Sequence, residues 1–208
     1  MTPPPRALLL DAMGTLITLR ESVGVSYATV ANRHGLQIDP LCIDRVFPEL
    51  IRQAPPLAFP GVAEADLRRA EINWWSDRIS AAMTTAPLPA GLAEDLFEHF
   101  ADPAQWRLFP EVPTCLERWR KRGLRLAIVS NFDSRLPVLL EGLGIDQLFD
   151  SVVVSSSAGA AKPDPKPFRL ALEALGIEAQ DAWHVGDSAE DVSGAAAAGV
   201  RCLLVQRP

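Results

Sequence analysis

The sequence has few of the residues that would tie it to an oxidising compartment, a membrane or a nucleic acid. Only three of its 208 residues are cysteines, and none forms a Cys-x-x-Cys pair, so we expect neither a disulfide framework nor a thiolate metal site. No apolar run approaches the roughly 18 residues that a transmembrane helix needs. Acidic residues outnumber basic ones by 26 to 20, for a net charge of −6. That balance argues against a nucleic-acid backbone or an anionic membrane as the main partner.

We expect no secretory signal peptide at the beginning of the sequence. The proline-rich segment 1–6 leads into one apolar run, Ala7 to Leu10, which is shorter than the ~7–15 residues of a secretory h-region. We therefore expect a cytoplasmic protein, and either a monomer or a homodimer. Hydrophobic residues make up 48% of the chain and charged residues 22%. This composition and the length of the chain support a packed core that needs neither disulfides nor a structural metal.

Short apolar runs alternate with helical patterns in two separated parts of the chain. The runs show no polar alternation, as is typical of strands buried on both faces; they cover residues 7–10, 124–129, 152–154, 183–185 and 202–205. Helical patterns lie between them and end at glycine or just before it, over 114–122, 164–176 and 189–198. Strands that alternate with helices predict an α/β fold with a doubly wound, Rossmann-like parallel sheet.

The middle of the chain has a different pattern, which is helical only. Proline-containing breaks separate four helical segments, at about residues 22–34, 39–52, 62–82 and 90–101. We expect a small bundle of four helices, without strands, inserted after the first strand. The predicted division is a discontinuous sheet domain of residues 1–17 plus 106–208 and a helical domain of residues 18–105.

Polar side chains stand where the predicted strands end. Because ligands bind at the carboxyl ends of the strands in an open α/β sheet, we expect these side chains to share one rim. Each alone is an ordinary turn or helix-cap residue, but together and in this order they indicate a site. The set comprises Asp11, Ser130, Asn131, Lys162, Asp187 and Asp191.

These segments resemble the four ordered motifs of the haloacid dehalogenase (HAD) superfamily. They read Asp11-Ala-Met-Gly-Thr-Leu16, Ser130-Asn131, Lys162-Pro163 and Gly186-Asp-Ser-Ala-Glu-Asp191. The resemblance covers the whole chain, and the inserted helices match the position of that superfamily's type C1 cap. The opening segment and the stretch 26–35 are most similar to the rhythmically-expressed-gene-2-like branch.

The resemblance implies a phosphatase that acts on a small phosphorylated metabolite. Asp11 would be the nucleophile and would form an aspartyl-phosphate. Ser130 would donate a hydrogen bond to the transferring phosphoryl group, and Lys162 would neutralise charge on it and on Asp11. Thr15, Asn131 and Arg20 are the expected substrate contacts.

The resemblance also implies Mg²⁺ as cofactor. The carboxylates of Asp11 and Asp187 and the backbone carbonyl of Met13 would hold the ion, which prefers hard oxygen ligands and keeps several waters. Asp191 would steady either the water shell of the ion or Lys162.

Met13 departs from the pattern of the HAD phosphatases. They carry a second Asp at this position, which is the general acid for the leaving group. Residues 11 and 13 of an extended segment point the same way, so we expect the Met13 thioether, which transfers no proton, to face the site. General acid–base catalysis is typically worth ~10²–10⁴-fold, so hydrolysis should be slow with poor leaving groups and faster with acyl or aryl phosphates. Asp133 or a cap residue could supply the acid instead, although Asp133 also suits the start of a helix near Ser134.

Three other functions fit a missing second Asp. A haloacid dehalogenase uses no metal, and three carboxylates against Lys162 would then repel an anionic haloacid. A phosphonoacetaldehyde hydrolase needs a cap lysine, but the lysines here, Lys121, Lys162 and Lys166, all lie outside the inserted segment. A regulatory protein that binds metal and phosphate without turnover would need only the residues that remain.

Two further expectations concern aromatic residues. Neighbours on a helix point about 100° apart, so one of Trp74 and Trp75 should be less buried and could line the cleft or a dimer surface. His184 lies inside a predicted strand and shows no metal-ligand spacing, so we expect a hydrogen-bonded core residue.

Overall fold

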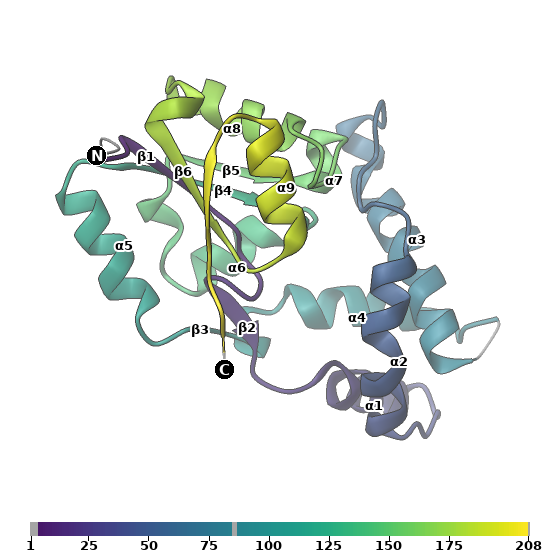
Figure 1. Cartoon of the computed structure of the whole chain (residues 1–208). Helices are drawn as coiled ribbons and strands as arrows, with labels where there is room; N and C mark the ends of the chain where they lie inside the picture. The colour runs from purple at the N-terminus through teal and green to yellow at the C-terminus, as the bar shows by residue number, and fades with distance from the viewer. Residues whose placement is uncertain (1–3, 85–86, 208) are drawn as a thin grey trace.

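A five-stranded parallel sheet forms the centre of the molecule, with the strand order β5-β4-β1-β6-β7 (Figure 1). The computed structural model describes residues 4–84 and 87–207. The strands are β1 (Ala7–Leu10), β4 (Arg125–Ser130), β5 (Ser151–Val154), β6 (Ala182–Gly186) and β7 (Arg201–Leu204). The first strand of the chain is central, and Leu10 pairs with Ile128 of β4 and Val185 of β6. The carboxyl ends of β1, β4 and β6 are therefore neighbours at the point where the strand order reverses, which is where α/β sheets bind ligands.

The side chains of β1 pack against helices on both faces of the sheet. Successive side chains of a strand point to opposite faces. Leu8 and Leu10 pack on the side of α5 (Val112–Lys121) and α6 (Leu136–Gly142). Ala7 and Leu9 pack on the side of α8 (Lys166–Leu175) and α9 (Ala189–Ala197). All four residues are buried, which explains the absence of polar alternation and confirms the doubly wound α/β fold.

Short elements complete the sheet domain. They are α7 (Ser155–Ala158) and the 3₁₀ turns η1 (Pro103–Gln105), η2 (Asp146–Leu148) and η3 (Ala179–Asp181). None of the helices in the described ranges combines the length and the apolar character that a membrane crossing requires.

Four helices form the cap, drawn in blue to teal in Figure 1. They are α1 (Val23–Arg33), α2 (Pro40–Gln53), α3 (Glu64–Met83) and α4 (Leu92–Ala101). Ser22 caps α1 by accepting a hydrogen bond from Val25, and Asp39 caps α2 just before a first-turn proline. The helices share a small apolar core that includes Tyr27, Val30, Ile43, Ile79 and Leu96. The four predicted helices are confirmed to within a few residues.

The cap and the sheet domain are joined by a two-stranded antiparallel ribbon that the sequence did not predict. Its strands are β2 (Ile17–Leu19) and β3 (Trp106–Leu108), with Ile17 paired to Leu108. The expectation that the inserted segment contains no strand is therefore wrong at its beginning, since Thr18 and Leu19 belong to β2. Three-residue strands are too short to show alternation, and each pairs with a segment far away in the sequence. Buried Ile17 and Trp106 hold the ribbon against the sheet core.

Candidate active site

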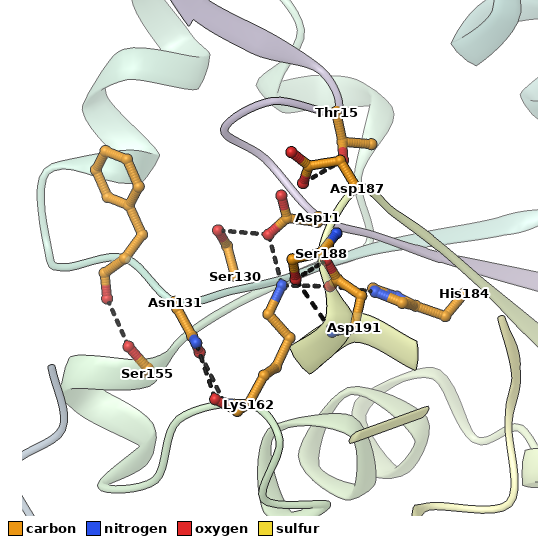
Figure 2. Close-up of polar contacts among 11 residues, drawn as sticks. Asp11, Thr15, Ser130, Asn131, Ser155, Lys162, His184, Asp187, Ser188 and Asp191 are labelled. Atoms are coloured by element: carbon orange, nitrogen blue, oxygen red, sulfur yellow. Dashed lines mark hydrogen bonds and ion pairs between the residues drawn. The ribbon is translucent and has the colours of Figure 1, made fainter. Parts of the chain in front are cut away.

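The predicted site residues converge at the rim where β1, β4 and β6 end. Asp11 directly follows β1, Ser130 is the last residue of β4, and Asp187 directly follows β6. Lys162 reaches the same place from the loop before α8, and Figure 2 shows these side chains turned toward one another. The structure thus brings together residues from four separate segments, as the strand-end positions predicted.

Asp11 and Lys162 form a buried ion pair at the centre of this cluster. Lys162 Nζ lies 2.6 Å from Asp11 Oδ1, and Ser130 Oγ donates to the same oxygen at 3.0 Å. Burial alone would lower the pKa of Lys162, but the carboxylates of Asp11 and Asp191 outweigh it and raise that pKa. Lys162 is therefore a fixed cation at neutral pH, aimed at the predicted nucleophile.

Asp191 holds Lys162 from the other side, and both of its oxygens are already bonded. Oδ1 accepts from Lys162 Nζ at 2.6 Å and from His184 Nε2 at 2.7 Å. Oδ2 accepts from the backbone N–H of Ser188 at 3.0 Å and from its hydroxyl at 2.6 Å. The backbone N–H of Asp191 donates to Ser188 Oγ in return, so the two residues form a capping box at the start of α9. Burial opposes ionisation, but the bonds from His184, Lys162 and Ser188 prevail and hold the pKa of Asp191 well below its usual range. Asp191 is thus a fixed anion that orients Lys162.

Glycine is required where two of these carboxylates pass the backbone. A Cβ at Gly186 would lie 2.2 Å from Asp191 Cγ. Gly14 has a φ of +81°, and a Cβ there would lie 2.2 Å from Asp187 Oδ2. The motif glycines therefore permit the close approach of the two loops to the acidic cluster.

Asp187 is the exposed member of the cluster. Its Oδ1 accepts a 3.4 Å hydrogen bond from Thr15 Oγ1. Partial desolvation and the like charges of Asp11 and Asp191 raise the pKa of the Asp187 carboxyl. The electrostatics at this point thus favour a bound cation.

The oxygen atoms of the cluster fit a divalent cation. One oxygen each of Asp11, Asp187 and Asp191 lies within 4.8 Å of the others. Neither Asp11 Oδ2 nor Asp187 Oδ2 is hydrogen-bonded by another residue that the structure describes. We call these two atoms the open oxygens. Two carboxylates that leave room for waters suit Mg²⁺, whereas Asp191 has no oxygen to spare.

The predicted substrate contacts fall into different places. Thr15 is buried and touches Asp187, so it lies at the site. The side-chain amide of Asn131 binds the backbone of Lys162 in both directions, at 3.0 and 2.7 Å, and so positions that residue. Arg20 lies just past β2 and is exposed; its N–H donates to Gln105 O, and its guanidinium forms no hydrogen bond or ion pair with the described residues. A contact of Arg20 with substrate stays a prediction.

Two predictions concern the missing general acid. Met13 is 46% exposed, and its facing the site stays a prediction. Asp133, by contrast, cannot supply the proton. It is fully buried and ion-paired with Arg135, whose Nη2 lies 2.6 Å from Oδ2, and it accepts a further bond from the Trp75 indole. It also accepts from the backbone N–H of Arg135. Helix α6 begins at Leu136 with Arg135 as its N-cap and has no side-chain cap, so the prediction that Asp133 caps this helix is wrong.

Two residues that donate hydrogen bonds to Asp191 are His184, whose burial the sequence predicted, and Ser188, for which the sequence analysis predicted no role. His184 is fully buried inside β6, as expected, and its ring meets Phe168 edge-on with centroids 4.9 Å apart. Ser188 was not predicted to contribute. The spacing of Ser188 and Asp191 matches the capping-box pattern, which is the sequence signal that could have identified it.

Comparisons with known proteins agree on one family. A family model described as haloacid dehalogenase-like hydrolase matches residues 5–199. Haloacid dehalogenase-like hydrolase domain-containing protein 3 of Bos taurus is 37% identical over 209 residues, which cover 98% of this chain and 82% of that protein. Phosphoglycolate phosphatase of Rhodospirillum rubrum is 34% identical over 204 residues, with 97% and 79% covered.

Solved structures share the fold. The crystal structure of CbbY from Rhodobacter sphaeroides in complex with phosphate has a TM-score of 0.69 to this chain at 22% identity. The match covers 96% of this chain and 85% of that one.

Proposed function

The chain belongs to the haloacid dehalogenase-like hydrolases, and from this premise we propose that it is a Mg²⁺-dependent phosphatase. The substrate is a small phosphorylated metabolite, hydrolysed through an aspartyl-phosphate on Asp11. The observation that carries the proposal is the buried contact of Asp11 with Lys162 and Ser130 beside two open oxygens. A phosphoglycolate phosphatase among the relatives supports the same class of substrate.

The residues present account for both halves of the reaction. A carboxylate oxygen of Asp11 attacks phosphorus, and the bond from phosphorus to the leaving oxygen breaks. Ser130 and Lys162 stabilise negative charge on the oxygens of the phosphoryl group while this group moves from the leaving oxygen to Asp11. A water then attacks phosphorus, releases inorganic phosphate and restores the Asp11 carboxylate, while its proton passes to solvent. Mg²⁺, held by the open oxygens of Asp11 and Asp187, would neutralise phosphate charge and fix its orientation.

Met13 sets the limit on the substrate. No proton donor occupies this position, so the leaving group must depart as its own anion or take a proton from water. General acid catalysis is worth ~10²–10⁴-fold for a poor leaving group and little for a good one. We therefore expect acyl and aryl phosphates to be hydrolysed faster than alkyl phosphates.

Met13 also supports two competing functions. Without a proton donor the protein could bind metal and phosphate in a regulatory role and turn nothing over. It could also hydrolyse a 2-haloacid, but Asp11, Asp187 and Asp191 against Lys162 leave excess negative charge for an anionic substrate, and no cap arginine is found at the described cluster. The charge balance therefore favours a cation and a phosphate.

The deciding experiment is hydrolysis of acetyl phosphate and an aryl phosphate by the wild type and by Asp11→Asn, each with Mg²⁺ and with EDTA. Turnover that needs Mg²⁺ and is lost in Asp11→Asn is the expected result. Absence of turnover in every condition would reject the phosphatase. Halide release from 2-chloropropionate, assayed in parallel, separates the dehalogenase from the regulatory protein.

A further inference from the structure

The loop that follows Ser130 and Asn131 is contacted by two parts of the cap, and a third part contacts Ser155 beside it. Helix α3 reaches it through Glu71 and Trp75, and α4 reaches it through the carbonyl of Phe97. The linker before α3 contacts Ser155, the first residue of α7. The Oγ atom of Ser155 lies within hydrogen-bond distance of Leu57 O in the linker and of Phe132 O in the loop. We call loop residues 132–135, with Glu71 and Trp75, the cap dock.

The first half of the cap dock is a buried ion pair whose arginine lies against two aromatic rings. Arg135 binds Asp133 through Nε at 2.8 Å and Nη2 at 2.6 Å. Its guanidinium lies over the rings of Phe97 and Trp75, at 4.1 and 5.2 Å. Trp75 Nε1 donates to Asp133 Oδ2 at 2.8 Å. A hydrogen bond to a buried, charged acceptor is among the stronger kinds in proteins.

The second half is the carboxylate of Glu71, which is fully buried. It accepts from the backbone N–H of Ser134 at 2.9 Å and from the hydroxyl of Ser134. A buried carboxylate requires such partners, and among the described residues they come from the loop across the interface alone. The loop and the cap helix therefore complete each other.

We propose that Trp75 and Glu71 are positioning residues of the active site. By binding residues 133–135 they fix the loop two residues beyond Asn131, and so hold Ser130 at Asp11 and Asn131 at the backbone of Lys162. The geometry of the phosphate site is then complete only while the cap is docked. The catalytic part of this inference rests on the proposed phosphatase function, whereas its structural part does not.

The test uses two adjacent tryptophans. Trp75→Phe removes the N–H that crosses to Asp133 but leaves Asp133 paired with Arg135. Trp74→Phe is the matched control, since the Trp74 indole donates to Pro55 O inside the cap, at 3.1 Å. Both side chains are half-buried. Losing a hydrogen bond to a charged acceptor should lower kcat for an aryl phosphate about tenfold in Trp75→Phe, with KM little changed, and leave Trp74→Phe near wild type.

Amide hydrogen exchange gives the readout that needs no activity. Exchange of residues 131–136 should become about tenfold faster in Trp75→Phe and stay unchanged in Trp74→Phe, while α1 and α2 are unaffected in both. Equal exchange of this loop in the two variants would overturn the proposal. So would a fall in kcat that both variants share. If no variant is active but the exchange differs as stated, the proposed function fails and the coupling of cap and loop stands.

A second substitution covers the case in which Trp75→Phe does not fold. Glu71→Gln keeps one carbonyl acceptor for Ser134 and should speed exchange of the loop several-fold, whereas Glu71→Ala should speed it more. Identical exchange in Glu71→Gln, Glu71→Ala and the wild type would also reject the proposal.

Discussion

Two acidic clusters, each with a buried carboxylate and a buried cation, lie a few residues apart in this molecule, and they differ in what their oxygens do. At the rim of the sheet, Asp11 and Asp187 each keep one open oxygen. In the cap dock, Asp133 and Glu71 have every oxygen bonded, by Arg135, Trp75 and Ser134. Each cluster holds a buried cation, so charge and burial do not separate a reactive site from a structural joint. The open oxygens do, because only they can bind a metal ion or attack a substrate.

Asp191 shows that the distinction applies to atoms and not to regions. It belongs to the motif cluster and lies close enough to share a metal ion. Both of its oxygens are nevertheless bonded, as in the cap dock. Its contribution is to hold Lys162, which is one of the two roles that the sequence left open for it.

Removal of the cation from each cluster should have the largest effect. Lys162→Met and Arg135→Met each leave buried carboxylates without their cation, so each should lose roughly 3–5 kcal/mol of unfolding free energy. Saturating Mg²⁺ should restore part of the loss only in Lys162→Met, where an open oxygen can bind the ion. Urea unfolding at neutral pH, with Mg²⁺ and with EDTA, measures both. Equal rescue of Arg135→Met would break the comparison between the clusters.

A proton donor at the rim should have the next largest effect. Met13→Asp introduces the carboxyl that the resemblance to HAD phosphatases implies at this position, so hydrolysis of an alkyl phosphate should rise about 10²-fold, while that of an aryl phosphate should change little. Steady-state rates on both substrates give the ratio. Met13→Asn, which has a similar shape but no proton to transfer at neutral pH, is the control and should leave the ratio as it is. A rise in both variants would show that side-chain size, not acid catalysis, limits the rate.

One substitution of the same kind should change stability in opposite senses in the two clusters. Asp133→Asn removes the charge that Arg135 needs and should lower the unfolding free energy by about 2–3 kcal/mol. Asp187→Asn should leave metal-free stability unchanged or slightly higher. The pKa of Asp187 is raised by desolvation and by its acidic neighbours, and an ionised group with a raised pKa opposes folding above that pKa.

Chemical unfolding in EDTA at pH 7 measures both variants. Phosphatase assays complete the contrast, because Asp187→Asn should lose the response to Mg²⁺ and Asp133→Asn should keep it. Destabilisation of Asp187→Asn comparable to that of Asp133→Asn would mean that the Asp187 carboxylate is structural.

Local patterns were sufficient to predict the sheet and the motif residues. The run Ala7 to Leu10 is apolar because both of its faces are covered, and Asp11 follows it directly, so a carboxylate at the rim could be predicted from this strand. Ser130 and Asp187 follow their strands in the same way. Parallel strands place their carboxyl ends together, so segments far apart in sequence could be assigned to one rim.

Features that depend on pairing between distant segments could not be predicted. The ribbon pairs Ile17 with Leu108 through strands of three residues each. Strands this short show no recognisable alternation of polar and apolar residues. The burial of Asp133 depends on Trp75 and Arg135, and no local pattern indicates that a cap helix will meet this loop. Asp133 therefore looked available as an acid, although its oxygens are fully bonded.

The smallest expected effect concerns the one structural carboxylate within the motif cluster. Ser188→Ala removes the hydroxyl bonded to Asp191 Oδ2 and the cap of α9, so it should cost about 1 kcal/mol at pH 7. Because the folded-state pKa of Asp191 is lowered, its bonds stabilise the protein above the unfolded-state value of 3.8 and lose that effect as the pH falls toward the folded-state value. Wild type and Ser188→Ala share the unfolded-state pKa, so the difference between them should shrink only when the pH falls through the lowered folded-state pKa. Urea unfolding at pH 7, 5 and 3.5 should therefore give the same difference, and a difference that already shrinks over this range would show that the bonds in the folded protein do not keep Asp191 ionised.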